Sequence, residues 1–390
     1  MEIVNVKDFG AKGDGVTDDR VAIQHAIDAA VAAGGGAISF PNTANNTYLL
    51  GSLGGTVNLP IPCSDANYQP VVTAEQYHFY LKNVTGLRFV GNGITLKSTV
   101  TNGGIMVIFD GARDIVWDGI GIQSLAAFNH ATGAVVTAGM NGVGFTSTVR
   151  DADRITIRNF VSTDAYVGLY TFGKPSGYRV RNVTVENALM VGGEYGIANH
   201  DNGDLMTFRD IRVLNVNARA WFAYGVDRID AEFLNQAAYN NLFGLFLIKA
   251  YDRDTTNITL KFKNTQHTNG GIYTLAVQSQ HNPVFQRRPC RVRNLRVNMD
   301  DSGNTGSSVG FDYLQDTTPQ ATSANNLFDN IVLAGHVQDG SSVVTSVVQA
   351  SPARGSLNVD DLVANTGTIG IMTGRGFYRH ALAPSPPTAS

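Results

Sequence analysis

The sequence predicts an all-β solenoid, in which one chain coils into successive turns of short strands, with an amphipathic helix near its N-terminus. Three observations support this prediction. Short strand-like segments recur along the 390 residues, and 42 glycines with many Asn and Asp residues supply the turns between them. A single apolar stripe at helical spacing lies close to the N-terminus. Stacked coils also let a chain of this length form one elongated domain.

The helix is expected at Asp19–Ala33. Thr17 or Asp18 suits the position before its first turn, and three glycines at 34–36 end it. Its apolar stripe consists of Ile23, Ala26, Ile27, Ala30 and Val31. An end coil of a solenoid exposes an apolar cross-section, and we expect this helix to cover it. The segment "AISFP" after the glycines reads as a short strand.

The Gly- and Asp-rich stretch before the helix also raises the question of a bound ion. No strand leads into a Gly-rich turn followed by Lys and Ser or Thr, which excludes a phosphate-binding loop. The spacing of Asp14, Asp18 and Asp19 does not fit a twelve-residue EF-hand loop. We therefore expect this stretch to build the fold, and the chemistry to lie on later coils.

Two families of β-rich segments alternate along the chain. The first comprises "GLRFVGNGITL", "DIVWDGIGIQS", "RITIRNFVS", "YRVRNVTVENA", "MTFRDIRVLNV", "TNITLKFKNT", "CRVRNLRVNM" and "NLFDNIVLAG". The second comprises "VGLYTFG", "YGIANHD", "WFAYGVD", "FGLFLIK", "GGIYTLAV" and "VGFDYLQ". We take one Asn or Asp in each later first-family segment as a marker of equivalent positions: Asn159, Asn182, Asp210, Asn257, Asn294 and Asn330. The gap of 47 residues between Asp210 and Asn257 then suits two coils.

Composition narrows the possible partners. A net charge of −3 gives no general electrostatic case for nucleic acid, and no apolar stretch is long enough to span a bilayer. The N-terminus shows no basic segment followed by an apolar run, so no secretory signal is visible. Residues 1–381 are expected to form the solenoid domain, and 382–390 form a Pro- and Ser-rich linker or tail. The oligomeric state is left open.

The opening stretch "VKDFGAKGDGVTDD…AIQHAIDAA…GGGAISFP" resembles the N-terminal signature of pectate-lyase-like, single-stranded right-handed parallel β-helix proteins. These include polysaccharide lyases, glycosidases and phage tailspikes. This stretch is particularly similar in sequence to the catalytic modules of secreted, calcium-dependent mannuronan C5-epimerases, which act on alginate. The resemblance covers about a tenth of the chain. It implies a carbohydrate-active enzyme, an extracellular location without a cleaved signal peptide, and a possible Ca²⁺ requirement.

A second, shorter motif also resembles those epimerases, whose active-site segment reads Tyr-Gly-Phe-Asp-Pro-His-Glu. This chain has "YGIANHD", which aligns the family's catalytic Tyr and His with Tyr195 and His200. The family's Asp falls on Ala198, which is a departure. Another catalytic Asp expected on the next coil aligns with Tyr224. Because the full epimerase constellation is missing, a lyase or a hydrolase is also a plausible activity.

The residues support a related hypothesis without the resemblance. Superposing Gly168, Gly196, Ala220 and Gly244 puts His200 and Tyr224 on adjacent coils, with Lys249 and Tyr195 nearby. Removing the proton α to a carboxylate requires a base, an acid and a cation that neutralises the carboxylate, and His, Tyr and Lys can fill these roles. We expect these four residues to converge in one open groove. The alternative is that each is an ordinary packing or surface residue.

Two further hypotheses stay open. Asp201, Asp204 and Asp227 could serve a glycoside hydrolase, which uses paired carboxyl groups, although turn residues are the commoner use of Asp. The alternative to any enzyme is a polysaccharide-binding or tailspike-like module, which would usually form trimers. The candidate substrate-binding residues are Arg228, Tyr251, Arg253, Tyr273, Arg287 and Arg288. They belong to a run of basic and aromatic residues that would suit an anionic polysaccharide, or would simply be solvated.

Overall fold

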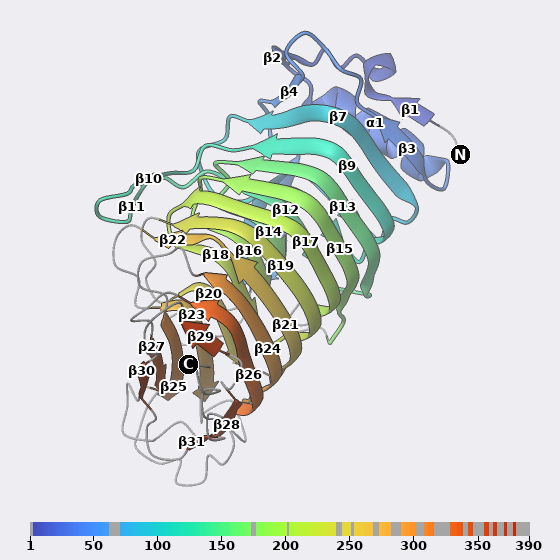
Figure 1. Ribbon diagram of the computed structural model, residues 1–390. Helices are drawn as coiled ribbons and strands as arrows, with labels where there is room; N and C mark the ends of the chain where they lie inside the picture. The colour runs from blue at the N-terminus through green and yellow to red at the C-terminus, as the bar shows by residue number, and fades with distance from the viewer. Residues whose placement is uncertain are drawn as a thin grey trace, which may run out of the picture.

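A computed structural model shows that the chain forms a right-handed parallel β-helix, as the sequence predicts (Figure 1). The structure describes residues 3–61, 71–172, 177–200, 203–238, 244–250, 253–267, 273–281, 290–301, 308–315, 328–337, 342–345, 355–358, 362–364, 370–372 and 377–379. The expected tail at 382–390 lies outside these residues. In the described part, no helix is long and apolar enough to cross a bilayer.

One wall of the β-helix, sheet A, contains 17 strands in the described part of the chain. They are β1 (Ile3–Asn5), β2 (Asp14–Asp18), β3 (Gly36–Ser39), β4 (Thr47–Leu50), β7 (Leu87–Ser98), β9 (Arg113–Gln123), β13 (Ala152–Thr163), β15 (Val180–Val191), β17 (Gly203–Val216), β19 (Asp227–Ala238), β21 (Thr255–Lys263), β22 (Thr265–His267), β24 (Val292–Asp301), β26 (Phe328–Val337), β28 (Gly355–Asn358), β29 (Leu362–Ala364) and β31 (Phe377–Arg379).

The facing wall, sheet B, has 12 strands among the same residues. They are β5 (Gly55–Ile61), β6 (Val71–Lys82), β8 (Ile105–Asp110), β12 (Asn141–Thr146), β14 (Val167–Thr171), β16 (Tyr195–His200), β18 (Arg219–Tyr224), β20 (Gly244–Ala250), β23 (Tyr273–His281), β25 (Ser308–Gln315), β27 (Ser342–Thr345) and β30 (Gly370–Met372). A separate antiparallel hairpin joins β10 (Ala127–Asn129) to β11 (Ala134–Thr137) and projects from one side of the stack (Figure 1).

The core lies between the two sheets and is filled by ladders of aromatic and aliphatic side chains. Phe109 and Phe145, on neighbouring coils of sheet B, stack with ring centroids 5.1 Å apart. Phe246 and Phe262 stack at 4.7 Å further along. Each such pair adds about 0.5–1.5 kcal/mol beyond the burial of its area. The same kind of side chain repeats from coil to coil, and this explains why the strand segments were visible in the sequence.

The N-terminal helix, α1, runs from Arg20 to Ala32, one residue shorter at each end than predicted. Its buried residues Ile23, Ala26, Ile27 and Ala30 belong to the same core as the sheets. The residue before the helix is Asp19, not Thr17 or Asp18, and its side chain makes no capping bond. Asp19 instead accepts hydrogen bonds from the backbone N–H groups of Lys12 and Gly13, at 2.6 and 2.9 Å. The acidic stretch therefore holds its own loop together.

Every repeated segment proposed from the sequence overlaps a strand, but the six Asn and Asp markers are not equivalent, which corrects the predicted spacing. Asn159 is followed one coil later by Asn187, whose Nδ2 donates to Asn159 Oδ1 across 28 residues. Asn257, Asn294 and Asn330 form a different row, linked by bonds across 37 and 36 residues. All five adopt positive φ, which Asn tolerates well. Each coil has more than one such bend, so the markers chosen from the sequence combined residues from two different rows of bends.

Candidate functional site

The outer face of sheet B carries a second hydrophobic cluster, separate from the core. Its buried members include Tyr170, Phe172, Ala198, Phe222 and Leu247, and the half-buried Tyr195 and Tyr224 pack against them. We call this the sheet B cluster. Ala198, Phe222 and Leu247 occupy one register position on three successive strands, β16, β18 and β20. An aromatic face with a few polar groups around it is typical of small-molecule and sugar sites.

Three of the four predicted catalytic residues form a ladder along one edge of this cluster. His200 on β16 is in register with Tyr224 on β18, and Tyr224 is in register with Lys249 on β20. The predicted stacking of His200 and Tyr224 on adjacent coils is therefore confirmed, and Lys249, which was expected only nearby, continues the ladder. The Lys249 Nζ lies 5.5 Å from the centroid of the Tyr224 ring. A cation over an aromatic face at this distance is attracted by the ring quadrupole.

The surroundings of His200 are aromatic on three sides. Its ring meets those of Tyr170, Phe222 and Tyr224 edge to face, with centroids 5.6, 4.8 and 4.7 Å away. His200 is only 7% exposed and Lys249 only 5%, so in the described part of the chain the expected groove is not open above these two residues. Burial, with Lys249 and Arg219 nearby, lowers the His200 pKa to about 3. The imidazole is therefore neutral at neutral pH, because a charged ring would lose its hydration there.

Two polar atoms in this region lack a hydrogen-bond partner among the described residues. They are Nδ1 of His200 and Nε of Arg219, both buried. Buried polar atoms in native proteins are nearly always paired, and an unpaired one calls for an explanation such as a ligand. Arg219 was not identified from the sequence. It is in register with Tyr195, and its guanidinium carbon lies 5.7 Å from that ring's centroid.

Tyr195 lies on the opposite side of Phe222 from His200. Its ring is 5.0 Å from that of Phe222 and 6.1 Å from that of Tyr166. Burial raises the Tyr195 pKa, so the phenol keeps its proton. Ala198, where the resemblance places an Asp, is fully buried at the centre of the cluster. The middle of this face is consequently apolar, and the titratable groups flank it.

Glu194 is a second residue that the sequence reasoning missed. It is 7% exposed, and its Oε2 accepts a hydrogen bond of 2.7 Å from Asn217 Nδ2. Burial raises the pKa of this carboxyl group, while bonds from Asn217 and Tyr195 and the charge of Arg219 oppose the rise. The two glycines before it, at 192 and 193, have positive φ and signal an unusual turn. That signal marks a special backbone but does not by itself indicate a buried acid.

The candidate hydrolase acids that can be located, Asp204 and Asp227, lie on sheet A instead. Asp204 is 2% exposed and binds Arg228 through two bonds, Nε–Oδ1 at 2.8 Å and Nη2–Oδ2 at 2.5 Å. Arg179 adds a third at 3.0 Å. These bonds outweigh the effect of burial and hold the Asp204 pKa below its usual range. Asp227 accepts from Thr256 and Asn257. Both carboxylates therefore join neighbouring coils of sheet A.

The predicted substrate-binding residues do not form one patch in the described part of the chain. Arg228 lies on sheet A with Asp204. Arg253 follows β20, and the backbone of Tyr273 begins β23. The wider basic run divides between the sheets, since Lys249 is on sheet B while Lys261 and Arg293 are on sheet A. Four predicted site residues lie outside the described residues: Asp201, Tyr251, Arg287 and Arg288.

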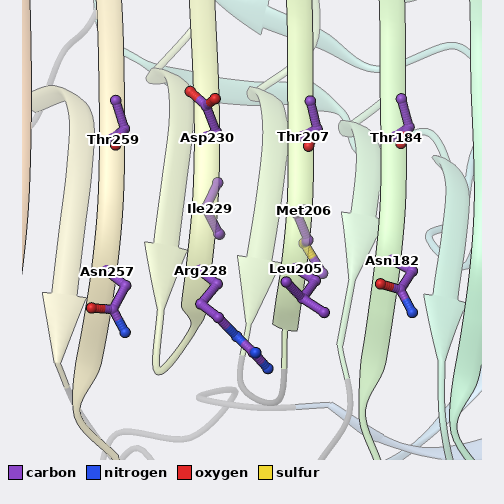
Figure 2. A pocket seen from close by; sticks show the side chains of 10 residues that line it. All are labelled: Asn182, Thr184, Leu205, Met206, Thr207, Arg228, Ile229, Asp230, Asn257 and Thr259. Carbon is purple, nitrogen blue, oxygen red and sulfur yellow. The ribbon is translucent and has the colours of Figure 1, made fainter.

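A hollow of about 470 Å³ lies on the outer face of sheet A, across β15, β17, β19 and β21 (Figure 2). Hydroxyl, amide and paired charged side chains line it. No metal site was found: among residues that the structure describes, no three His, Cys, Asp or Glu side chains are grouped so that they could hold an ion. The possible Ca²⁺ therefore has no assigned ligands here.

Comparison with known proteins supports the fold and indicates a resemblance to carbohydrate-active proteins without indicating one reaction. Residues 3–50 match the family model described as rhamnogalacturonase A/epimerase, pectate lyase-like, a match that ends before β16. Mannuronan C5-epimerase AlgE6 of Azotobacter vinelandii is 78% identical over 37 residues, 10% of this chain and 4% of that protein. Plasmin and fibronectin-binding protein A of Streptococcus pneumoniae is 27% identical over 254 residues, 62% of this chain and 31% of that protein.

Among solved structures, the Agl-KA catalytic domain aligns with 97% of this chain and 68% of its own, at 12% identity and a TM-score of 0.51. This likeness shows the fold alone. The chain spans less than a third of the length of each of the two curated relatives. It resembles carbohydrate-active β-helix proteins, and epimerases in particular through the short N-terminal match.

Proposed function

We propose that this protein acts on an acidic polysaccharide outside the cell by removing the C5 proton of a uronate residue, as a uronan epimerase or lyase. One observation carries the proposal: a neutral, buried His200 stands in register with Tyr224 and Lys249, with Arg219 also close enough to lower its pKa. A base, a phenol and two cations are the groups that this reaction requires.

In this mechanism His200 is the base. Its low pKa leaves a lone pair free to accept a proton at any pH well above about 3. The unpaired Nδ1 is the available acceptor in the described surroundings. Because the side chain is 7% exposed, the sugar has to displace covering groups to reach it, and the closed site would then exclude water from the carbanion.

Lys249 and Arg219 would meet the carboxylate. The electron pair left on C5 delocalises into that carboxylate, and a positive charge beside it stabilises the resulting dianion. Arg219 offers an unpaired Nε–H for this contact. From the same intermediate, a phenol can return a proton to the opposite face, which inverts C5. Otherwise the bond from C4 to the glycosidic oxygen breaks and leaves a C4–C5 double bond, with a phenol protonating the departing oxygen.

Hydrolysis remains a second candidate because of Glu194. A buried carboxyl group with a raised pKa is the usual form of a glycosidase general acid, and Glu194 borders the sheet B cluster through Tyr195. Asp204 is a weaker candidate because three hydrogen bonds from arginines hold it ionised. A binding module without activity is the third candidate, consistent with the longer match to plasmin and fibronectin-binding protein A.

Product analysis on a panel of polyuronates and neutral glycans separates these candidates. We expect either products with unsaturated ends, which are detected by their ultraviolet absorbance, or a changed epimer ratio at constant chain length. New reducing ends without unsaturation would replace the proposal with hydrolysis, and Glu194→Gln would then be the variant to test. Binding of the same polymers with no change in any of them would replace it with a binding module.

A further inference from the structure

We propose that the hollow on sheet A is a saccharide-binding site, distinct from the sheet B cluster, that takes an uncharged stretch of a glycan chain across four coils. Two rows of outward side chains line it (Figure 2). One row consists of Asn182, Leu205, Arg228 and Asn257, and the other of Thr184, Thr207, Asp230 and Thr259. The second row is in strict register from β15 to β21.

The first row is unusual at Leu205. All four of its residues have positive φ, between 52° and 57°, and the same bend on later coils is occupied by Asn294 and Asn330. Asn tolerates this conformation, whereas a bulky apolar residue adopts it only at a cost. Leu205 is also 40% exposed. On earlier coils the row continues with Arg154 and Asp114, so Leu205 is its one apolar member among the described residues. Backbone outliers at bulky residues concentrate at functional sites.

The asparagine ladder stops where the hollow begins. Nδ2 of Asn330 donates to Asn294 and that of Asn294 to Asn257, at 2.9 and 2.8 Å. Nδ2 of Asn257 then donates to Asp227 instead, at 2.8 Å. Asn182, on the far side of the gap, donates to Asp153 at 2.5 Å. Between Asn182 and Asn257 the two positions without an asparagine are Leu205 and Arg228, and they are the middle of the hollow.

The charges in the hollow are already paired, and this determines the class of ligand. The guanidinium of Arg228 is held by Asp204 and points away from the threonine row (Figure 2). Asp230 is held by Arg209. What remains for a ligand is the hydroxyl groups of Thr184, Thr207 and Thr259, nearby amides, and the apolar side chain of Leu205. Hydroxyl groups paired with an apolar patch match a sugar, whose hydroxyls and C–H faces alternate.

The geometry also suits a chain rather than a single sugar. Neighbouring strands are about 4.8 Å apart, so the threonine row presents hydrogen-bonding groups at a regular step along the axis of the β-helix. The inference does not depend on catalysis at His200, because the hollow and the sheet B cluster lie on different sheets.

The test is calorimetric titration of the full chain with neutral and uronate oligosaccharides. The titrations use the His200→Asn variant, which the proposed function predicts to be inactive. We expect at least one neutral oligosaccharide to bind, and Leu205→Asn to weaken it tenfold or more while raising Tm, since it relieves the strain and extends the ladder. Thr207→Val should weaken binding as well. Thr156→Val is the matched control, because Thr156 is in register with Thr184 but does not line the hollow.

Two results would overturn the inference. One is the absence of binding by any oligosaccharide of the panel. The other is binding that Leu205→Asn and Thr207→Val leave unchanged, which would assign the ligand to another face. If Leu205→Asn lowers Tm, the affinities of Thr207→Val and Thr156→Val still decide the question. Neither of these changes alters the strained bend, and the inference requires that only Thr207→Val weakens binding. The proposed function is tested separately, by measuring the activity of the protein that retains His200.

Discussion

The imidazole of His200 stands edge to face against the phenol ring of Tyr224 on the next coil, with centroids 4.7 Å apart and planes at 81°. Backbone register fixes this contact, since the two residues are direct partners of β16 and β18. The relationship places a neutral imidazole next to a phenol, and several predictions depend on it.

His200→Asn should lower turnover on the true substrate by about 10²–10⁴-fold, the usual worth of a general acid–base group. Asn keeps a polar side chain at this buried position but cannot transfer a proton. Steady-state kinetics measure the loss, and circular dichroism checks the fold. His25→Asn is the matched control, since His25 lies exposed on α1 and should leave turnover unchanged. Normal turnover by His200→Asn would contradict the proposed mechanism at its centre.

Lys249→Met should impair activity most on charged substrates. The methionine keeps much of the buried apolar stem but removes the charge proposed to meet the carboxylate. We expect kcat/KM for a polyuronate to fall at least tenfold further than for its carboxyl-reduced counterpart. Lys261→Met, on the exposed face of sheet A, serves as the control. An equal loss on both substrates would mean that Lys249 only supports the packing.

His200 should also make the fold sensitive to acid. Its pKa is about 3 in the folded state, against an ordinary value of 6.5, so as the pH falls the unfolded chain takes up the proton first. The stabilisation is complete above pH 6.5 and is lost as the pH falls towards 3. Between pH 7 and pH 4 the free energy of unfolding, relative to His200→Asn, should fall by about 3 kcal/mol. Denaturant titrations at the two pH values measure it, and parallel curves for the two proteins would refute it.

Asp204→Asn should lower stability and leave turnover nearly intact. The change deprives Arg228 and Arg179 of their shared carboxylate, and we expect a loss of about 1–3 kcal/mol, since both guanidinium groups can still reach water. Asp210→Asn removes a more exposed pair with Arg212 and should cost less than about 1 kcal/mol. A large loss of turnover with normal stability would favour the hydrolase hypothesis.

Gly193→Ala should be strongly destabilising. A Cβ atom there would lie 1.8 Å from the backbone oxygen of Ala165, and φ is +80°. Gly34 has nearly the same φ, +82°, but open space around it, so Gly34→Ala should cost only the strain of about 1–2 kcal/mol. Thermal unfolding of both variants isolates the steric part. Equal shifts in Tm would show that the chain at Gly193 can move away from Ala165.

The sequence by itself determined the strands and part of the site. The alternation of buried and exposed residues is local, so each β-rich segment could be recognised before any coil was assembled. Superposing Gly196 and Ala220 likewise gave the register of His200 and Tyr224, because one strand follows the next directly. The same superposition at Gly244 put Ile248 in this row, whereas the structure puts Lys249 there.

Only the tertiary structure decided burial, pairing and strain. Coils differ in length because of their loops, so no spacing in the sequence indicated that Asp204 meets Arg228 and Arg179, or that Asn159 and Asn182 belong to different rows. The low pKa of His200 depends on its burial among rings from three neighbouring positions. The raised pKa of Glu194 also depends on burial, which outweighs the opposing bond from Asn217. The conformation of Leu205 is likewise imposed by the bend that the coils share, which the leucine itself does not favour.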